Sequence, residues 1–572
     1  MSKSLPITGA EALILTLIDQ GVDRVFGYPG GSIMPIYNAL FDHTDQLTHI
    51  LTRHEQGSVH AAQGYARATG KIGVVFTTSG PGATNIVTGI ADALADSTPL
   101  VAITGQVNNE HLGFDAFQET DVVGVTLPVA KWSFQVRRAA DIVPVVSRAF
   151  YIASSGRPGP VVVDITLDAQ KEMTTFDPPK EWHIRSYSPC PELDGEAVKA
   201  AASLINQSGK PMIIAGQGVI LSGAESELVA FAEKIGAPVC CTLLGLSAIP
   251  SSHPLYKGMV GMHGNVAANV NTNCADLIIA VGMRFDNRVT SNERTYAHNA
   301  KVIHIDIDDS EFDKCIFADV KVHADAKQAL TALTALTTEA QHDEWLKAFD
   351  RPAEIEMEKV TRPELQPTSA QLNMGEVVAK VSEAFGHDAI VVTDVGLNQM
   401  MASKYSQYKR PRSLITSGGL GTMGFGLPAA IGAKMGCPDR QVVLFAGDGG
   451  LQMTIQELGT IMEHGTAVKI VLLNNHFLGN VRQLQTVFYN SRFSATPLQS
   501  PDFVTIARGY GIKGECVSAR DDLDAAIQRL AQSDGPYLLN VEIAEADMVF
   551  PMIKGGDDVD HIMLNLNEYY QP

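Results

Sequence analysis

The chain has 572 residues, too many for one hydrophobic core, so its length predicts about three domains. Hydrophobic residues make up 45% of the chain and charged residues 19%, the balance of an ordinary globular protein. The formal net charge of -20 argues against nucleic acid as the main partner. No apolar run reaches membrane-spanning length without a charge or a Gly/Pro break, so a membrane is not an expected partner either.

The seven cysteines are odd in number and form no CxxC pair. We therefore expect them to be reduced, as in a cytosolic protein. The first residues, 1–7, contain neither a signal-peptide apolar region nor an Arg/Ser-rich transit segment. Together these features predict a cytoplasmic location.

Short apolar runs alternate with amphipathic helical stretches along the whole chain. In chain order, the runs that we expect to be strands are 73–77, 99–104, 159–164, 212–215, 277–281, 302–306, 390–393, 441–446 and 468–473. Strands that are apolar on both faces belong to parallel sheets covered by helices. The predicted fold class is therefore α/β, with parallel sheets wound on both sides.

Two segments are expected to be linkers, a proline-rich one at 176–191 and a highly charged one at 341–368. They divide the chain into an N-terminal part (1–180), a middle part (190–345) and a C-terminal part (368–572), each fit for one α/β domain. The first and third parts share a strand, glycine turn, helix and strand at nearly equal intervals. A duplication would explain this, but any two βαβ units look alike, and the two explanations are equally open.

One helical stretch, 57–70, is preceded by Glu55 and ends at Gly70, a plausible C-terminal cap. Glu55 is thus expected at a strand-to-helix junction, partly buried. Taken alone, it is most simply a carboxylate favoured by the dipole at a helix N-terminus.

Two polar groups end neighbouring apolar runs near the C-terminus. Gly447-Asp448-Gly449 follows the first run, and Asn474-Asn475 follows the second, with twenty-four residues between them. A right-handed crossover would bring both strand ends to the same sheet edge. There the Asp448 carboxylate and an Asn carbonyl can share one hard cation, with backbone amides near a phosphate.

A series of motifs in order along nearly the whole chain is more specific. They are FGYPGG at 26–31, RHEQ at 53–56, TSGPGATN at 78–85, DAFQE at 115–119, SGRPGP at 155–160, GMHG at 261–264, RFDNR at 284–288, SGGLGTMGFGLP at 417–428 and GDG at 447–449. With this series the chain resembles the catalytic large subunit of acetohydroxyacid synthase, also called acetolactate synthase. The resemblance implies three doubly wound domains that bind the pyrimidine of thiamine diphosphate, FAD, and the diphosphate.

The resemblance also implies roles for single residues. Glu55 is the acid that activates the cofactor through pyrimidine nitrogen N1′. Gln118, from a facing subunit, reaches the reactive side of the cofactor, while Phe117 and Arg288 meet the second 2-oxoacid. Met423 wedges between the cofactor rings and enforces their bent arrangement.

The same resemblance gives three sets of binding residues. Mg²⁺ is held by Asp448, Asn475 and the backbone carbonyl of Phe477. The contacts to thiamine diphosphate are Tyr28, Pro29, Gly30, Asn85, Val395, Gly396, Leu397, Asn398, Gly421, Met423, Gly447, Gly449, Gly450, Gly479 and Asn480. The contacts to FAD, which is structural because the net reaction is not a redox reaction, are Arg157, Gly216, Thr242, Leu243, Met262, His263, Arg284, Asp306 and Asp325.

Several positions depart from the family pattern. Leu397-Asn398 stands where Gln-His is usual, and Leu397 cannot hydrogen-bond a diphosphate. Leu484 replaces a tryptophan, Asn480 a methionine, and Leu167 a lysine. The smaller Leu484 removes an apolar contact worth a few kcal/mol at most, so we expect a weaker preference for 2-oxobutyrate over pyruvate as acceptor.

The implied activity is decarboxylation of pyruvate and ligation of the two-carbon unit to a second 2-oxoacid, for branched-chain amino acid biosynthesis. The implied assembly is a homodimer or tetramer, with a small regulatory subunit as a further partner. The polar stretch 487–501 is expected to be a mobile lid. Two alternatives stay open: a related thiamine diphosphate carboligase or acetyltransferase with another acceptor, and a non-catalytic paralogue.

Overall fold

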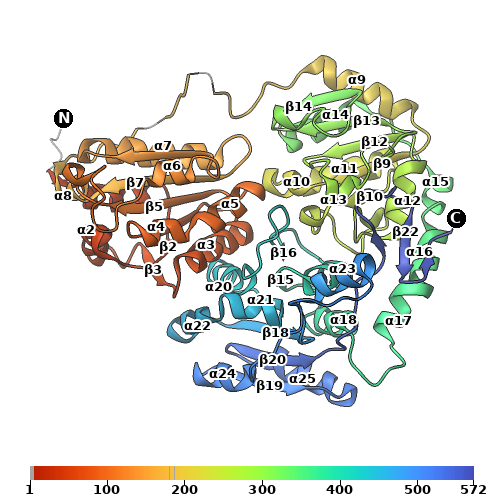
Figure 1. Cartoon of the computed structure of the whole chain (residues 1–572). Coiled ribbons are helices and arrows are strands. Elements are labelled where there is room, and N and C mark those ends of the chain that lie inside the picture. Colours follow the sequence, from red (N-terminus) through yellow and green to blue (C-terminus); the bar gives the residue numbers. More distant parts are fainter. Residues whose placement is uncertain (1–5, 180, 186, 572) are drawn as a thin grey trace.

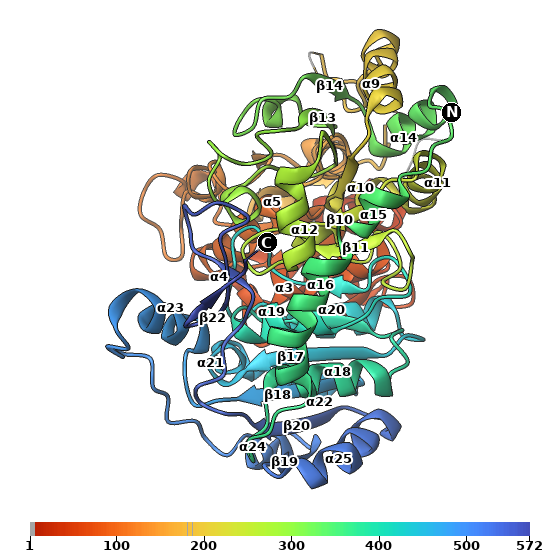
Figure 2. The same cartoon turned by 90° about the vertical axis from the view of Figure 1, so that its right-hand side faces the viewer.

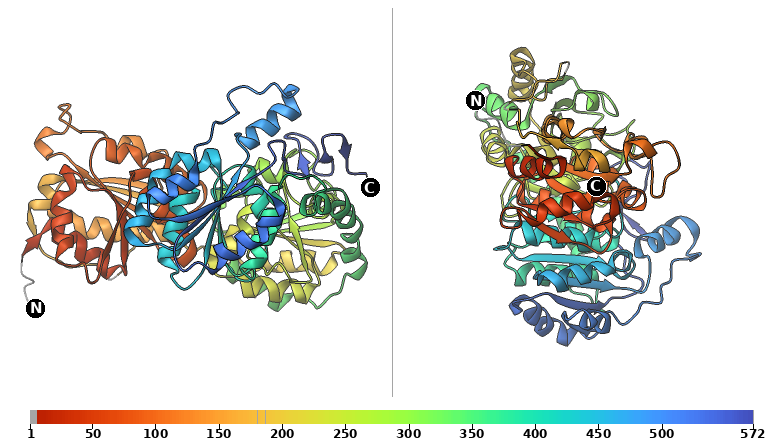
Figure 3. Two further views of the ribbon diagram at one scale, coloured as in Figure 1. Left: turned by 90° about the horizontal axis from the view of Figure 1, so that it is seen from below. Right: turned by 90° about the vertical axis from the view of Figure 1, so that its left-hand side faces the viewer.

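The computed structural model describes residues 6–179, 181–185 and 187–571 and contains three six-stranded sheets, each parallel throughout (Figure 1). We name the N-terminal, middle and C-terminal domains after these sheets. Seen from below, the N-terminal and middle domains occupy opposite ends of the molecule, with the C-terminal sheet between them (Figure 3). In the described ranges, no helix is both long and apolar enough to cross a membrane.

The N-terminal sheet has the strand order β3-β2-β4-β5-β7-β6. Its strands are β2 (Arg24–Gly27), β3 (Thr48–Leu51), β4 (Gly73–Thr77), β5 (Leu100–Gln106), β6 (Trp132–Val136) and β7 (Pro160–Thr166). The surrounding helices are α1 (Gly9–Asp19), α2 (Met34–Phe41), α3 (Glu55–Thr69), α4 (Pro81–Asn85), α5 (Val87–Ala95), α6 (Val122–Thr126), α7 (Ile142–Ser154) and α8 (Leu167–Lys171). A short antiparallel pair, β1 (Ile7–Thr8) with β8 (Met173–Thr174), closes this domain.

The C-terminal sheet has the order β16-β15-β17-β18-β20-β19. Its strands are β15 (Ile390–Thr393), β16 (Leu414–Ile415), β17 (Val442–Gly447), β18 (Val468–Asn474), β19 (Lys513–Val517) and β20 (Tyr537–Glu542). Its helices are α18 (Met374–Ala384), α19 (Leu397–Tyr405), α20 (Gly426–Gly436), α21 (Asp448–Met453), α22 (Leu458–His464), α23 (Gly479–Tyr489), α24 (Phe503–Gly509) and α25 (Arg520–Gln532). Numbered within each sheet, the N-terminal and C-terminal sheets share one strand order, 2-1-3-4-6-5. This shared order exceeds what two unrelated βαβ units have in common and favours relatedness.

The middle sheet has a different order, β11-β10-β9-β12-β13-β14, which is 3-2-1-4-5-6 within the sheet and is typical of dinucleotide-binding folds. Its strands are β9 (Pro211–Ala215), β10 (Val239–Cys241), β11 (Tyr256–Met259), β12 (Leu277–Val281), β13 (Lys301–Asp306) and β14 (Val320–His323). Its helices are α9 (Gly195–Gln207), α10 (Gln217–Ser222), α11 (Glu225–Ile235), α12 (Val266–Cys274), α13 (Asn287–Thr290) and α14 (Ala326–Leu336).

The α/β prediction and all nine predicted strands are confirmed. The reason is visible in β5 and β7, which are buried at every residue because helices cover both faces of the sheet. Helix α3 also matches its prediction, since Gly70 ends it in the left-handed conformation with φ 77°.

The charged segment at 341–368, which we expected to be a linker, is mostly helical. It forms α15 (Asp343–Lys347), α16 (Asp350–Glu356), a π-helical turn (Met357–Thr361) and α17 (Arg362–Leu365). Glu356 is buried here and accepts hydrogen bonds from the Val266 N–H and the Asn265 side chain of the middle domain. Tertiary contacts of this kind stabilise helices that the local pattern does not predict.

The N-terminal and C-terminal domains meet where α3 packs against α20. The two backbones nearly touch: a Cβ atom on Gly432 would lie 1.8 Å from the carbonyl oxygen of Ala61. Only glycine permits this approach. The C-terminal segment then returns to the middle domain as β21 (Met552–Ile553), β22 (Ile562–Asn565) and β23 (Glu568–Tyr569), as Figure 2 shows.

Candidate active site

The carboxyl edge of the C-terminal sheet brings the two predicted metal-binding side chains together. Strands β17 and β18 pair in parallel with Gly447 opposite Leu473, so Asp448 and Asn475 follow neighbouring strands at one edge. Asp448 is 1% exposed; its Oδ2 accepts a hydrogen bond from Ser500 Oγ at 2.6 Å. Its Oδ1 is buried and has no partner among the described residues.

A divalent cation fits this arrangement. A buried carboxylate oxygen without a donor is costly, and a cation would satisfy it. Burial also raises the pKa of the Asp448 carboxyl, with the Ser500 hydroxyl opposing the shift. Asn475 Oδ1 accepts only a long bond of 3.3 Å from the Phe477 N–H, which leaves this oxygen and the Phe477 carbonyl as further ligands.

Three helices begin at the same edge, and their N-termini suit a diphosphate. Helix α19 begins after β15, α21 after β17, and α23 shortly after β18. The predicted cofactor residues at these starts are Gly396, Leu397, Asn398, Gly447, Gly449, Gly450, Gly479 and Asn480. The strand order reverses between β15 and β17, the position at which open α/β sheets bind ligands.

The two unusual residues at the start of α19 face inward. Leu397 is 3% exposed and packs in the core that the C-terminal and middle domains share. Asn398 Nδ2 donates to the carbonyls of Asp394 at 2.9 Å and Phe445 at 3.0 Å, so its side chain ties β15 to β17. In this chain the backbone of the α19 N-terminus, rather than these side chains, is left to meet a phosphate.

The N-terminal sheet offers a different group at the corresponding edge. Glu55 is the first residue of α3 and is half-buried, as predicted. Its Oε2 accepts a hydrogen bond of 2.9 Å from Nδ2 of Asn85, which ends α4. Tyr28, Pro29 and Gly30 follow β2 at the point where this sheet also reverses its strand order.

The DAFQE motif lies in an exposed loop of the same domain. The Glu119 carboxylate accepts from the backbone N–H groups of Gly113 and Ala116 and holds the loop in shape. Gln118 has a positive φ of 61°, and Phe117 is 88% exposed. The loop therefore presents a large aromatic ring to solvent in the single chain.

A cavity of about 960 Å³ lies at the carboxyl end of the middle sheet, where its strand order also reverses. All the residues predicted to contact FAD except Gly216 line it, namely Arg157, Thr242, Leu243, Met262, His263, Arg284, Asp306 and Asp325. Gly216 lies behind the wall, where its N–H donates to the Val281 carbonyl and ties β9 to β12.

Burial shapes the electrostatics of this cavity. It raises the pKa of Asp306 to about 6 and lowers the pKa of His263 to about 4. Arg157 Nη1 donates to Asp308 at 3.2 Å and Glu311 at 2.8 Å, which joins the N-terminal domain to the middle domain. The wall of the cavity thus carries the guanidinium groups of Arg157, Arg284 and Arg288 beside the neutral imidazole of His263.

The cavity continues to the C-terminal domain, where Val395, Gly421, Asn480 and Leu484 line it with Arg288 of the middle domain. Among the lining residues, Glu55, Phe117 and Gln118 are missing. One chain therefore brings Arg288 and Leu484 together in this cavity, but it does not add Glu55, Phe117 or Gln118 to the lining.

Helix α23, which carries Asn480 and Leu484, is anchored by a residue that the sequence analysis missed. Gln483 is 1% exposed and is the buried residue of this helix. Its Nε2 donates to the Val549 carbonyl and its Oε1 accepts from the Val549 N–H, both at 2.9 Å. No sequence pattern singled out this glutamine, because its burial depends on the contact with Val549 in a distant segment.

The stretch 487–501, expected to be a mobile lid, begins inside α23 and is tied down beyond it. Leu478 N–H donates to Thr496, and Leu498 N–H donates to His476. The Arg482 guanidinium lies between two rings, 4.9 Å from the ring centre of Phe477 and 4.7 Å from that of Phe493 in the stretch. These contacts fasten the stretch to the turn after β18, and nothing in the sequence pattern pointed to the Ser500–Asp448 bond.

Comparison with known proteins gives a consistent result. The chain matches the family models of the thiamine pyrophosphate enzyme N-terminal TPP binding domain over residues 7–125, the central domain over 198–333, and the C-terminal TPP binding domain over 394–541. It is 44% identical to an acetolactate synthase large subunit of Lactococcus lactis, over 98% of this chain and 96% of that protein. It is 43% identical to a probable acetolactate synthase large subunit of Methanocaldococcus jannaschii, over 97% and 95%. It is 42% identical to the acetolactate synthase isozyme 3 large subunit of Escherichia coli, over 98% and 99%.

Proposed function

Because the chain belongs to the acetolactate synthase large-subunit family of thiamine diphosphate enzymes, we propose that it decarboxylates pyruvate and joins the two-carbon unit to a second 2-oxoacid. Pyruvate as acceptor gives 2-acetolactate, and 2-oxobutyrate gives 2-aceto-2-hydroxybutyrate, for branched-chain amino acid biosynthesis. The observation that carries the proposal is the parallel pairing of β17 and β18, which places Asp448 with its unpartnered oxygen beside Asn475.

The metal and the cofactor are assigned to the C-terminal edge. Asp448, Asn475 and the Phe477 carbonyl would hold Mg²⁺, and the N-termini of α19 and α21 would hold the diphosphate. Thiamine diphosphate, when bound, supplies the nucleophilic carbon and the electron sink for decarboxylation. Met423 would support its bent arrangement.

The proton chemistry is assigned to the N-terminal edge. Asn85 fixes Oε2 of Glu55, which leaves Oε1 free to share a proton with nitrogen N1′ of the pyrimidine. Gln118 and Phe117 would close over the reactive side. At the acceptor side, the Arg288 guanidinium would pair with the carboxylate of the second 2-oxoacid.

The middle domain is proposed to hold FAD. Its strand order is that of dinucleotide-binding folds, and a cavity of about 960 Å³ is large enough for an extended cofactor. Because the net reaction transfers no electrons, the flavin would act as a structural wall of the site.

The active unit is proposed to be a homodimer or a tetramer, joined by a small regulatory subunit.

 The exposed Phe117 ring and the absence of Glu55 from the described cavity lining are what a site shared between two chains would leave in one chain. The N-terminal domain of one subunit would meet the C-terminal domain of its partner.

Product identification tests the proposal. Purified protein with Mg²⁺, thiamine diphosphate and FAD is incubated with ¹³C-labelled pyruvate, with and without 2-oxobutyrate, and the products are identified by NMR. We expect 2-acetolactate from pyruvate alone. Release of acetaldehyde or acetate without ligation would contradict the proposed activity.

A related carboligase with another acceptor is the second candidate, because Leu484 and Asn480 both line the cavity at the acceptor side. With equal pyruvate and 2-oxobutyrate we expect a weak preference for 2-oxobutyrate. A strong bias toward it would refute the role given to Leu484.

A further inference from the structure

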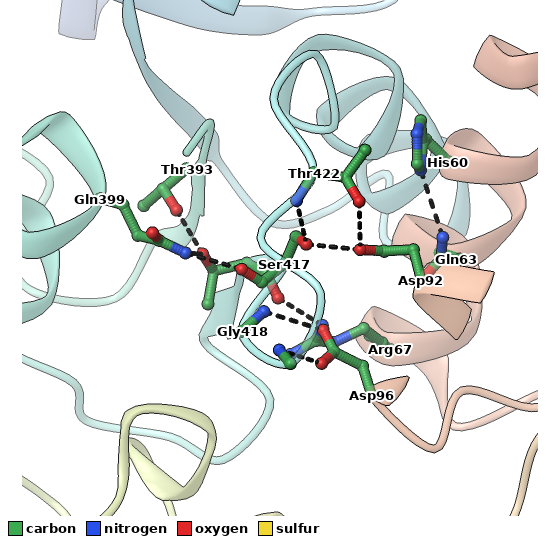
Figure 4. Close-up of polar contacts among 12 residues, drawn as sticks. His60, Gln63, Arg67, Asp92, Asp96, Thr393, Gln399, Ser417, Gly418 and Thr422 are labelled. Atoms are coloured by element: carbon green, nitrogen blue, oxygen red, sulfur yellow. Dashed lines mark hydrogen bonds and ion pairs between the residues drawn. The ribbon is translucent and has the colours of Figure 1, made fainter. Parts of the chain in front are cut away.

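Two buried aspartates of the N-terminal domain hold the backbone of a loop in the C-terminal domain (Figure 4). Asp92 and Asp96 lie one helical turn apart at the end of α5, and both are 0% exposed. Asp96 Oδ1 accepts from the Gly419 N–H at 2.6 Å, and its Oδ2 accepts from the Gly418 N–H at 3.0 Å. One carboxylate therefore fixes two consecutive peptide groups.

Asp92 holds the two ends of the same loop. Its Oδ1 accepts from Ser417 Oγ at 2.5 Å and from Thr422 Oγ1 at 2.7 Å. Ser417 Oγ in turn accepts from the Thr422 N–H at 2.8 Å. The loop 417–422 is thereby closed on itself over a carboxylate that belongs to another domain.

Further bonds fix the start of the loop at Thr416. Arg67, near the end of α3, donates from Nη1 to Asp96 at 3.1 Å and to the Thr416 carbonyl at 2.6 Å. From the C-terminal domain, Gln399 Nε2 donates to Thr416 Oγ1 at 2.7 Å and to the Ser417 carbonyl at 2.8 Å. The loop is held from both domains at once.

The loop leads directly to residues that we assign to thiamine diphosphate binding. It runs through Gly421, which lines the large cavity, to Met423. Gly419 is needed for the contact with α5, because a Cβ atom there would lie 2.8 Å from Asp96 Oδ1 and 3.0 Å from the Ala95 Cβ. A shift of the Asp92 and Asp96 carboxylates would therefore move the loop and the residues that follow it in the chain.

Holding the two domains together does not require that Asp92 and Asp96 be charged. The close packing of α3 on α20 already joins the domains through apolar and glycine contacts. Burial raises the pKa of Asp92 and raises that of Asp96 to about 6, so keeping these carboxylates ionised at neutral pH is costly. Apolar residues join domains at less cost, whereas a carboxylate on backbone N–H groups specifies the path of a loop.

We propose that Asp92 and Asp96 are positioning residues that fix the loop 417–422 and thereby place Met423 against thiamine diphosphate. The N-terminal domain of each chain would then set the cofactor geometry in its own C-terminal domain. This inference rests on the proposed use of thiamine diphosphate.

The test uses the full-length protein with Asp96→Asn and Asp92→Asn. Two quantities are measured with Mg²⁺ present: the Kd of thiamine diphosphate, by fluorescence titration, and the near-ultraviolet circular dichroism of the bound cofactor at saturation. We expect Asp96→Asn to raise the Kd about ten-fold and to diminish the dichroic band even at saturation. Asp92→Asn should act in the same direction but less strongly, because its partners are neutral hydroxyl groups.

The matched control is Asp164→Asn. Asp164 is equally buried in the N-terminal domain but accepts from Thr104, Gln106 and Gln135, away from the loop. It should leave the Kd and the dichroic band unchanged. Equal losses in this control would mean that any buried charge matters, and would overturn the inference.

Milder variants keep the test decisive if Asp96→Asn does not fold. Ser417→Ala and Thr422→Val each remove one donor to Asp92 and should diminish the dichroic band several-fold less than Asp96→Asn. Wild-type Kd and a full band in all the folded loop variants would overturn the inference alone. Failure of the wild-type protein to bind thiamine diphosphate would instead overturn the proposed function.

Discussion

The N-terminal and C-terminal sheets share one strand order but carry different chemistry at the edge where that order reverses. The N-terminal edge presents Glu55, a half-buried acid braced by Asn85. The C-terminal edge presents Asp448 and Asn475 with glycine-rich helix starts. The fold supplies two equivalent places for ligands, and a few residues after the strands decide what each place does.

The middle sheet extends this comparison. Its order differs, and its reversal point opens into a cavity of about 960 Å³ that residues of all three domains line. Because one chain forms this cavity, a ligand can bind there without a second chain. The two equivalent edges instead leave groups such as Phe117 uncovered, which suits a site completed by a second chain.

Removing the acid from the N-terminal edge should have the largest effect on activity. Glu55→Ala should lower the rate of product formation by at least about 100-fold, because a positioned acid–base group contributes that much or more. Binding of Mg²⁺ and the melting temperature should stay near wild type. The control is Glu463→Ala, which removes a surface carboxylate paired with the neighbouring Arg53. Near-normal turnover of Glu55→Ala would refute its assignment.

Substitutions at the C-terminal edge should weaken Mg²⁺ binding. Asp448→Asn removes the one charged ligand and should weaken Mg²⁺ binding by about ten-fold or more, measured by calorimetry. Ser500→Ala should weaken it only a few-fold, since Ser500 orients the carboxylate through Oδ2. Equal metal affinity in Asp448→Asn and wild type would place the cation elsewhere.

Helix α23 at the C-terminal edge is held by the bonds between Gln483 and Val549, and none of the N-terminal contacts described above matches them. Gln483→Ala removes two buried hydrogen bonds to Val549 and should lower the free energy of unfolding by about 2 kcal/mol. Hydrogen exchange should become faster over 479–501. The exposed Val481→Ala is the control, and unchanged exchange in Gln483→Ala would show that the helix is held by other contacts.

The His60 ring of α3 lies 5.3 Å from the ring of Phe425, across the contact between the two domains, and should make the stability of the protein depend on pH. Burial lowers the pKa of this imidazole to about 3, below its ordinary value of 6.5, so it is neutral in the folded protein. The unfolded chain binds more protons between these values, and the free energy of unfolding should therefore fall as pH drops below about 6.5, by at most about 1.4 kcal/mol per pH unit from this residue.

Urea unfolding at pH 5.0 and 7.5 measures this effect. His60→Gln should flatten the pH dependence, although the buried His49 and His263, whose pKa values are lowered to about 4, act in the same direction. A His60→Gln variant with the wild-type slope would show that other groups control acid stability.

The sequence predicted what depends on local pattern. The nine apolar runs became strands because both faces of each sheet are covered, and the GDG and NN groups met because parallel neighbours end at one edge. It also placed Glu55 at the start of a helix. These features need only periodicity, caps and a fixed crossover hand.

Contacts between segments far apart in the chain could not be predicted from the sequence pattern. Asp96 meets Gly418 and Gly419 across more than 300 positions, and Ser500 meets Asp448 across 52. The charged segment 341–368 became helical because Glu356 accepts hydrogen bonds from the Val266 N–H and the Asn265 side chain of the middle domain. Each depends on tertiary packing that overrides local propensity.

We propose that the N-terminal edge of one chain, with Glu55, and the C-terminal edge of its partner, with Asp448, together make one site. Mixing two inactive variants tests this arrangement directly. Glu55→Ala and Asp448→Asn proteins are unfolded, mixed in equal amounts, refolded together and assayed for 2-acetolactate. Half of the random dimers then contain one chain of each kind, and each has one intact site, so about a quarter of wild-type activity should return. No recovery in dimers shown to have exchanged chains would mean that both edges of a site belong to one chain.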